Sequence, residues 1–267
     1  MSELQFAVAS KPRRSPGPLI STALFIKRTL YHIRNNAMGL VFEAVLSPAI
    51  MMFIFTFLFS GAIAGSVSEY IQYLLPGFIL VTVVPMTVYS GSTICTDISK
   101  GVYHRFRTMP FWQPSPLFGA ILADGVRYVL ALVSVILVGM NLGFRPEDGA
   151  RGIVLAAMYM LLFTYSVSWV FAYIGNLAKQ AETVSGTSMM LIYPLLFASN
   201  VLVDPATMPR WLQVIVEINP ISIAVTLTRG LLHGNASAFG LATGLGVCLL
   251  MIAIFAPLTI WVYLKKQ

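Results

Sequence analysis

The chain has 267 residues, of which 57% are hydrophobic and only 10% are charged, and its formal net charge is +7. Together with a mean hydropathy of +0.81, this composition excludes an ordinary water-soluble globular domain and indicates an integral membrane protein. The positive charges lie in the segments between apolar runs, where membrane topology accounts for them, so we expect no nucleic-acid partner.

The first 38 residues divide into two parts. Residues 1–18 are polar and contain three prolines, which predicts a cytoplasmic tail. No cleaved signal peptide is expected, because Lys27 and Arg28 interrupt the first apolar stretch. Residues 19–38 repeat apolar side chains at steps of three and four, which predicts an amphipathic helix along the membrane surface, with Arg28 and His32 on its polar face. A frayed extension of the first membrane span is the alternative.

Six apolar runs are each long enough to cross a bilayer, which takes about 20 residues. They make residues 39–267 a six-span transmembrane domain, so the predicted fold class is all-α. The runs cover residues 40–63, 73–95, 117–144, 153–177, 184–203 and 239–264.

The loop between the last two runs is unusually apolar. It contains two apolar pieces of about ten residues each, too short to span, which are separated by Asn219 and Pro220. Because proline interrupts a continuous helix, we predict two short re-entrant helices that dip into the outer leaflet. A plain interfacial loop is the alternative.

The lysines and arginines predict the orientation. If the N-terminus is inside, twelve of the 17 lie on the cytoplasmic side, four lie outside and Arg127 lies within a span. The positive-inside rule therefore places both termini in the cytoplasm. The twelve are Lys11, Arg13, Arg14, Lys27, Arg28, Arg34, Lys100, Arg105, Arg107, Lys179, Lys265 and Lys266.

Few side chains suggest chemistry. The three histidines lie outside the apolar centres of the spans, which argues against an intramembrane enzyme. The small residues 90–92 predict close helix packing rather than a nucleophile. Asp124 and Arg127 are three residues apart on one helical face and predict an ion pair. No acidic residue lies near the middle of a span, which argues against an ion-coupled secondary transporter.

A short polar segment, residues 96–116, separates the second and third runs and reads TDISKGVYHRFRTMPFWQPSP. It is basic and helical in its spacing, as expected of a cytoplasmic docking element. The chain itself has no G-x-x-x-x-G-K-[ST] loop to bind the phosphates of ATP, so ATP-driven transport would need an ATPase on another subunit. This segment is therefore the predicted contact with such a partner.

Several motifs carry a family resemblance. They are Tyr70 with Pro76-Gly77 at the start of the second span, Asp97, Gly101, Arg105 and Pro110 after it, and Met208 to Gln213 followed by Asn219-Pro220 in the last loop. In this order the pattern resembles the ABC type 2 exporter permeases, and is similar to the drug-export branch that includes the daunorubicin exporter permeases. The resemblance extends over nearly the whole chain, from about residue 19 to residue 264.

The resemblance implies a membrane subunit that works with two nucleotide-binding ATPase subunits and a second permease, either another copy or a sister chain. ATP and Mg²⁺ would bind to the partner, and no cofactor is expected in this chain. The permease would lie in the plasma (inner) membrane and export a hydrophobic or amphipathic drug or natural product. A lipid or a lipid-linked polysaccharide is the alternative cargo.

The resemblance also implies roles for particular residues. The elbow helix would begin at Leu19. A coupling helix would contact the ATPase through Asp97, Lys100, Gly101, His104, Arg105, Arg107 and Pro110. The outer gate would include Trp211, Asn219 and Pro220. The pathway would be lined by the first, second and fifth spans, with the candidates Met52, Phe55, Met86, Tyr89, Met190 and Tyr193. Lys100 departs from the family pattern, which tends to be acidic before the glycine, so an acidic rim is expected on the partner.

Overall fold

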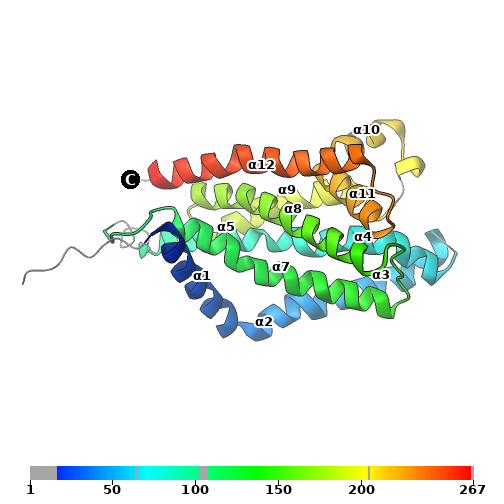
Figure 1. Ribbon diagram of the computed structural model, residues 1–267, viewed down its shortest axis with the longest axis horizontal. Coiled ribbons are helices and arrows are strands. Elements are labelled where there is room, and N and C mark those ends of the chain that lie inside the picture. Colours follow the sequence, from blue (N-terminus) through cyan, green and yellow to red (C-terminus); the bar gives the residue numbers. More distant parts are fainter. Residues whose placement is uncertain (1–16, 64, 103–107, 204, 266–267) are drawn as a thin grey trace, which may run out of the picture.

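The computed structural model describes residues 17–63, 65–102, 108–203 and 205–265, and this part of the chain contains helices and no strands. The long helices follow one axis; α1 lies obliquely at the end where the chain terminates, and α10 and α11 lie at the opposite end (Figure 1). The elements are α1 (Pro18–Asn35), α2 (Ala37–Val41), the π-helical turn η1 (Phe42–Leu46), α3 (Ser47–Ile63), α4 (Val67–Met86), α5 (Val88–Ser99), α7 (Ser115–Asn141), α8 (Gly149–Leu177), α9 (Ala181–Phe197), the 3-10 turn η2 (Pro205–Thr207), α10 (Arg210–Ile218), α11 (Pro220–Leu232) and α12 (Ala238–Lys265).

Five helical segments within the described residues are long and apolar enough to cross a membrane. They coincide with the first four and the last of the predicted runs, and they cover Ala37–Gly61, Val67–Ser99, Ser115–Asn141, Gly149–Leu177 and Ala238–Lys265. The remaining run, 184–203, corresponds to α9, which has 17 residues and is slightly short of the usual span. The predicted break in the last loop is present, since α10 and α11 meet at a bend of 77°.

The second span is the centre of the bundle. Of its most apolar window, 72% is buried, compared with 11% for α12, whose apolar surface is left for lipid. Its α5 half approaches α8 so closely that an added Cβ on Gly91 would overlap the carbonyl of Phe171, and one on Gly175 would overlap the carbonyl of Gly91. This confirms the predicted close packing at Gly91, because only glycine lets the two backbones touch.

A proline shapes the first span. Pro48 has no N–H to donate to Ala44, four residues earlier, and its ring crowds that carbonyl. The helix widens just before it into η1, where the N–H of Ser47 donates to the carbonyl of Phe42, five residues back. The carbonyl of Ala44 is buried and accepts a hydrogen bond of 2.6 Å from Ser134 Oγ on α7. A side chain of a neighbouring helix therefore satisfies the backbone group that the proline leaves unpaired.

Replacing Ser134 by alanine is expected to lower the free energy of unfolding by about 1–3 kcal/mol, because the Ala44 carbonyl loses its partner in a place without water. Thr243→Ala is the control, since Thr243 lies on α12 and its hydroxyl bonds only to its own helix. Denaturant unfolding of the purified chain measures both. Equal stability of the two variants would contradict this account of η1.

The helix predicted over residues 19–38 is present as α1, and the face that packs on the bundle combines polar and apolar side chains. Leu19 is 87% exposed, whereas Ser21 and Ile33 are buried. Arg28 contacts α5, and the backbone at Phe25 lies directly against Gly119 of α7. Ile33 from the predicted apolar face and Arg28 from the predicted polar face thus both face the bundle, whereas Leu19 and His32 are exposed.

Candidate functional site

A cleft of about 460 Å³ lies among η1, α3, α4, α5 and α9, which is within the usual size range for small-molecule sites. Aromatic and methionine side chains dominate its wall, and the rings of Phe55 and Phe78 are 6.2 Å apart. Most of the polar side chains in its wall carry hydroxyl groups; those of Ser92 and Ser185 are 3.5 Å apart on facing helices. Among the described lining residues, Glu43 is the one that carries a charge.

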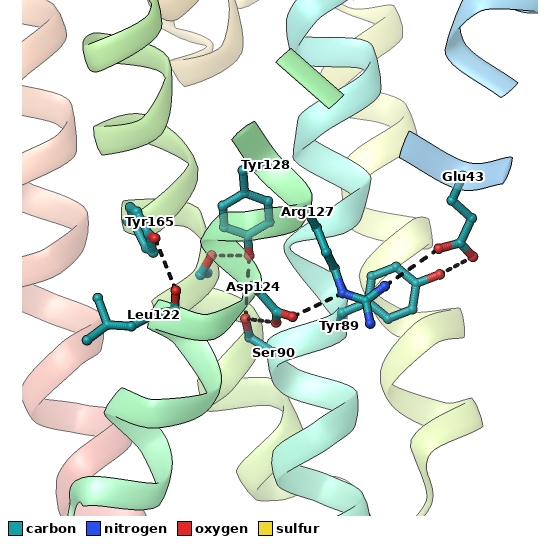
Figure 2. Close-up of polar contacts among 9 residues, drawn as sticks. Glu43, Tyr89, Ser90, Leu122, Asp124, Arg127, Tyr128 and Tyr165 are labelled. Atoms are coloured by element: carbon teal, nitrogen blue, oxygen red, sulfur yellow. Dashed lines mark hydrogen bonds and ion pairs between the residues drawn. The ribbon is translucent and has the colours of Figure 1, made fainter. Parts of the chain in front are cut away.

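A network of charged and hydroxyl side chains begins at Glu43 and runs into the bundle (Figure 2). The hydroxyl of Tyr89 donates to one oxygen of Glu43, and the other oxygen lies 3.8 Å from Arg127 Nη1. The Arg127 guanidinium lies over the Tyr89 ring at 4.4 Å and approaches Asp124 more closely, at 3.2 Å. The predicted ion pair between Asp124 and Arg127 is therefore confirmed, with Glu43 as a second, more distant anion.

The inner end of this network is fully packed. Asp124 is 2% exposed and accepts a hydrogen bond of 2.7 Å from Ser90 Oγ on α5. The Tyr128 hydroxyl lies 2.9 Å from Ser168 Oγ on α8 and 3.5 Å from that of Ser90 (Figure 2). These contacts join α5, α7 and α8 around one buried carboxylate, whose charge requires the paired guanidinium.

A second cavity, of about 370 Å³, lies among α1, α5 and α7, and Asp124 and Arg127 of the network line it as well. Here Arg28 holds Asp97 through two hydrogen bonds of 2.7 and 2.6 Å. The bond to Asp97 raises the pKa of the Arg28 guanidinium, so this side chain stays charged. The ion pair fastens α1 to the end of α5 from which the polar segment leaves.

The opposite end of the bundle is fastened by side chains that bind backbone carbonyls. Asn219 caps α11 through its oxygen, and its nitrogen donates to the carbonyls of Leu195 and Ala198 at the end of α9. Arg229 lies over the ring of Tyr73 at 4.0 Å. An added Cβ on Gly77 would come within 2.6 Å of the carbonyl of Val201. The segment that follows α9 is thus packed against α4, and Asn219 joins the end of α9 to the start of α11.

The structure separates the predicted pathway residues into two groups. Phe55, Met86, Tyr89 and Tyr193 line the cleft. Met52 is fully buried in the core, and Met190 is 78% exposed outside the cleft. The neighbouring methionines, Met51 and Met189, line it in their place.

The predicted coupling residues are only partly described. Lys100 ends α5, and Gly101 follows with φ +70°, a conformation that suits glycine at a helix end. Asp97 is held by Arg28, and Pro110 is exposed. His104, Arg105 and Arg107, in the middle of the predicted coupling helix, lie outside the described residues. Of the predicted gate residues, Trp211 is exposed on α10, Asn219 is buried and Pro220 opens α11.

Comparison with known proteins assigns the family. Residues 21–233 match the family model described as ABC-2 type transporter. The daunorubicin resistance ABC transporter permease protein DrrB1 of Streptomyces coeruleorubidus is 45% identical over 259 residues, covering 95% of this chain and 92% of that protein. The chain belongs to the ABC-2 type transporter family. A more distant relative of this ABC-2 permease, the probable doxorubicin resistance permease DrrC of Mycobacterium tuberculosis, is 21% identical, covering 84% of this chain and 83% of its own.

Membership confirms the family and the exporter function predicted from the sequence. The ABC-2 permease is a multi-pass membrane protein and the membrane component of its exporter, not the ATPase. Such a permease implies a nucleotide-binding partner subunit, and its family typically binds no cofactor itself. Within the described residues, no group of three or more His, Cys, Asp and Glu side chains could hold a metal.

Glu43 and Arg28 were not among the site residues predicted for this ABC-2 permease. A carboxylate inside an apolar run is costly and marks a site by default, and Pro48, five residues later, signals an irregular turn. Those two signals together could have identified Glu43. The partner of Arg28 is 69 residues away, and no local pattern indicates it.

Proposed function

We propose that this ABC-2 permease exports daunorubicin-like amphipathic drugs. The observation that carries the proposal is the 45% identity with a daunorubicin resistance permease across 95% of the chain. The cleft supports it, because its aromatic and methionine wall suits a flat apolar molecule. A polysaccharide would need many more polar partners than this wall offers.

In the proposed arrangement the chain crosses the membrane six times, with α9 as a short fifth span and both termini in the cytoplasm. At 1.5 Å per residue, α9 is about 25 Å long, close to the hydrocarbon thickness of about 30 Å. The bent pair α10 and α11 would be re-entrant from the outside. The figure supports this, since the pair lies at the end opposite the C-terminus (Figure 1).

The polar segment 97–110 would dock on the ATPase, one ATPase for each of two permeases. Gly101 would let the chain turn away from α5 there, and Arg105 would contact the partner. Because Arg28 and Asp97 join α1 to α5 at this point, a push on the segment would reach both helices. The second permease would lie against the flanks of the cleft on α3 and α9, where Phe57 and Met190 are exposed.

Uptake of daunorubicin into inverted membrane vesicles that contain the chain and its ATPase tests this function. The expected result is uptake that requires ATP and that falls sharply when Gly101→Val and Arg105→Ala remove the docking features. Uptake without ATP, or undiminished uptake by the docking variant, would contradict the proposal.

A further inference from the structure

We propose that Glu43 recognises the positive charge of a cationic, aromatic amphiphile in the cleft. The proposal rests on the export function above and names the chemical class that the site selects. Its starting point is that Glu43 is the one charged group among the described residues of an otherwise apolar and hydroxyl-lined wall. In such surroundings a single charge decides which ligand charge is preferred. The described residues of the wall offer no cation to offset the repulsion between Glu43 and an anionic ligand.

The charge of Glu43 is only partly balanced by the protein. Glu43 and Asp124 share the single guanidinium of Arg127, which lies 3.2 Å from Asp124 and 3.8 Å from Glu43. Asp124 is buried, whereas the Glu43 side chain is 43% exposed. The three groups together carry one net negative charge, and Glu43 is the member that faces the cleft. A bound cation would complete the balance.

The cations that line the second cavity do not line the cleft. Arg28 is held by Asp97 in the second cavity. Lys100 and His32 also line that cavity and not the cleft. Asp124 and Arg127 line the second cavity too, so the cations there face the buried end of the network, whereas Glu43 lines the cleft. The negative charge at Glu43 thus remains available to a ligand.

The surroundings of Glu43 also hold it in place. It lies in η1, the π-helical turn whose carbonyl at Ala44 is fixed by Ser134. Tyr89 donates its hydroxyl to the carboxylate and lines the cleft itself. Phe55, Phe78 and Tyr193 lie along the same wall, where they can contact the flat body of a ligand. Aromatic faces also attract cations, which favours the same class of ligand.

The test uses two anthraquinone probes of equal shape, one with a trimethylammonium tail and one with a tert-butyl tail, so that they differ only in a permanent charge. ATP-dependent uptake of each is measured in proteoliposomes with the chain and its ATPase. For the wild type, the concentration that gives half-maximal uptake is expected to be at least about tenfold lower for the cationic probe than for the neutral one. Close pairs of opposite charge contribute enough binding energy for such a difference. In Glu43→Gln the ratio of the two half-maximal concentrations should be near one, because uptake of the cationic probe alone is weakened.

Glu69→Gln is the matched control, because Glu69 is an exposed carboxylate outside the cleft, and it should keep the wild-type ratio. An unchanged ratio in Glu43→Gln, or no preference in the wild type, overturns the role of Glu43 and leaves the exporter function standing. Failure of the wild type to take up either probe with ATP contradicts the export function as well. If Glu43→Gln loses both probes equally, the residue is structural and the proposal is wrong.

Discussion

Replacing Arg127 by methionine is expected to lower the free energy of unfolding by about 3–5 kcal/mol, the usual cost of removing one member of a buried ion pair. The reason is that Asp124, at 2% exposure, would lose the cation that compensates its buried carboxylate. Glu43 would lose its second contact at the same time. Denaturant unfolding of the purified chain in lipid or detergent measures the change.

The double variant Arg127→Met with Asp124→Asn is the control. It removes both charges, leaves an amide that can still accept from Ser90, and should recover most of the lost stability. A single variant as stable as the wild type would show that the pair is not needed for folding. A double variant no better than the single one would show that Arg127 acts through packing instead.

Replacing Gly175 by alanine is expected to lower the free energy of unfolding by about 1–3 kcal/mol or more, as overpacking does in a close-packed interior. The added methyl group would overlap the backbone of Gly91, and backbone cannot move aside as a side chain can. The helices α5 and α8 must then separate, which also strains the contact of Tyr128 with Ser168. The temperature of thermal unfolding and the rate of ATP-dependent uptake should both fall.

Gly246→Ala supplies the comparison for that variant. Gly246 lies on α12 with nothing within 4 Å of an added Cβ, so alanine there should be neutral or stabilise by up to about 1 kcal/mol through helix propensity. If Gly175→Ala and Gly246→Ala behaved alike, the close crossing of α5 and α8 would be contradicted.

The spans could be predicted because a membrane imposes one strong rule, about 20 apolar residues for each crossing. The ion pair between Asp124 and Arg127 could be predicted for a similar reason, since residues three apart share a helical face. The break at Asn219-Pro220 followed from proline alone. These features depend on local sequence, and the structure has the ion pair, the break and five of the six predicted spans at full length.

Features that depend on distant parts of the chain could not be predicted. Arg28 meets Asp97, and Glu43 meets Tyr89, through packing of helices far apart in sequence. The pathway candidates show a second limit. Consecutive residues of a helix point about 100° apart, so choosing Met52 rather than Met51 selected the core instead of the cleft. Residue type indicated helices that border the cleft, but the rotation of each helix is set by its neighbours.

The central claim is that substrate passes through the cleft between α3, α4, α5 and α9. The most direct test compares ATP-dependent daunorubicin uptake by Val81→Trp, which places an indole in the cleft, with uptake by Leu249→Trp on the exposed surface of α12. Thermal unfolding confirms that both variants are folded. The account predicts that Val81→Trp loses most of its uptake and Leu249→Trp keeps it. Full uptake by folded Val81→Trp would contradict it.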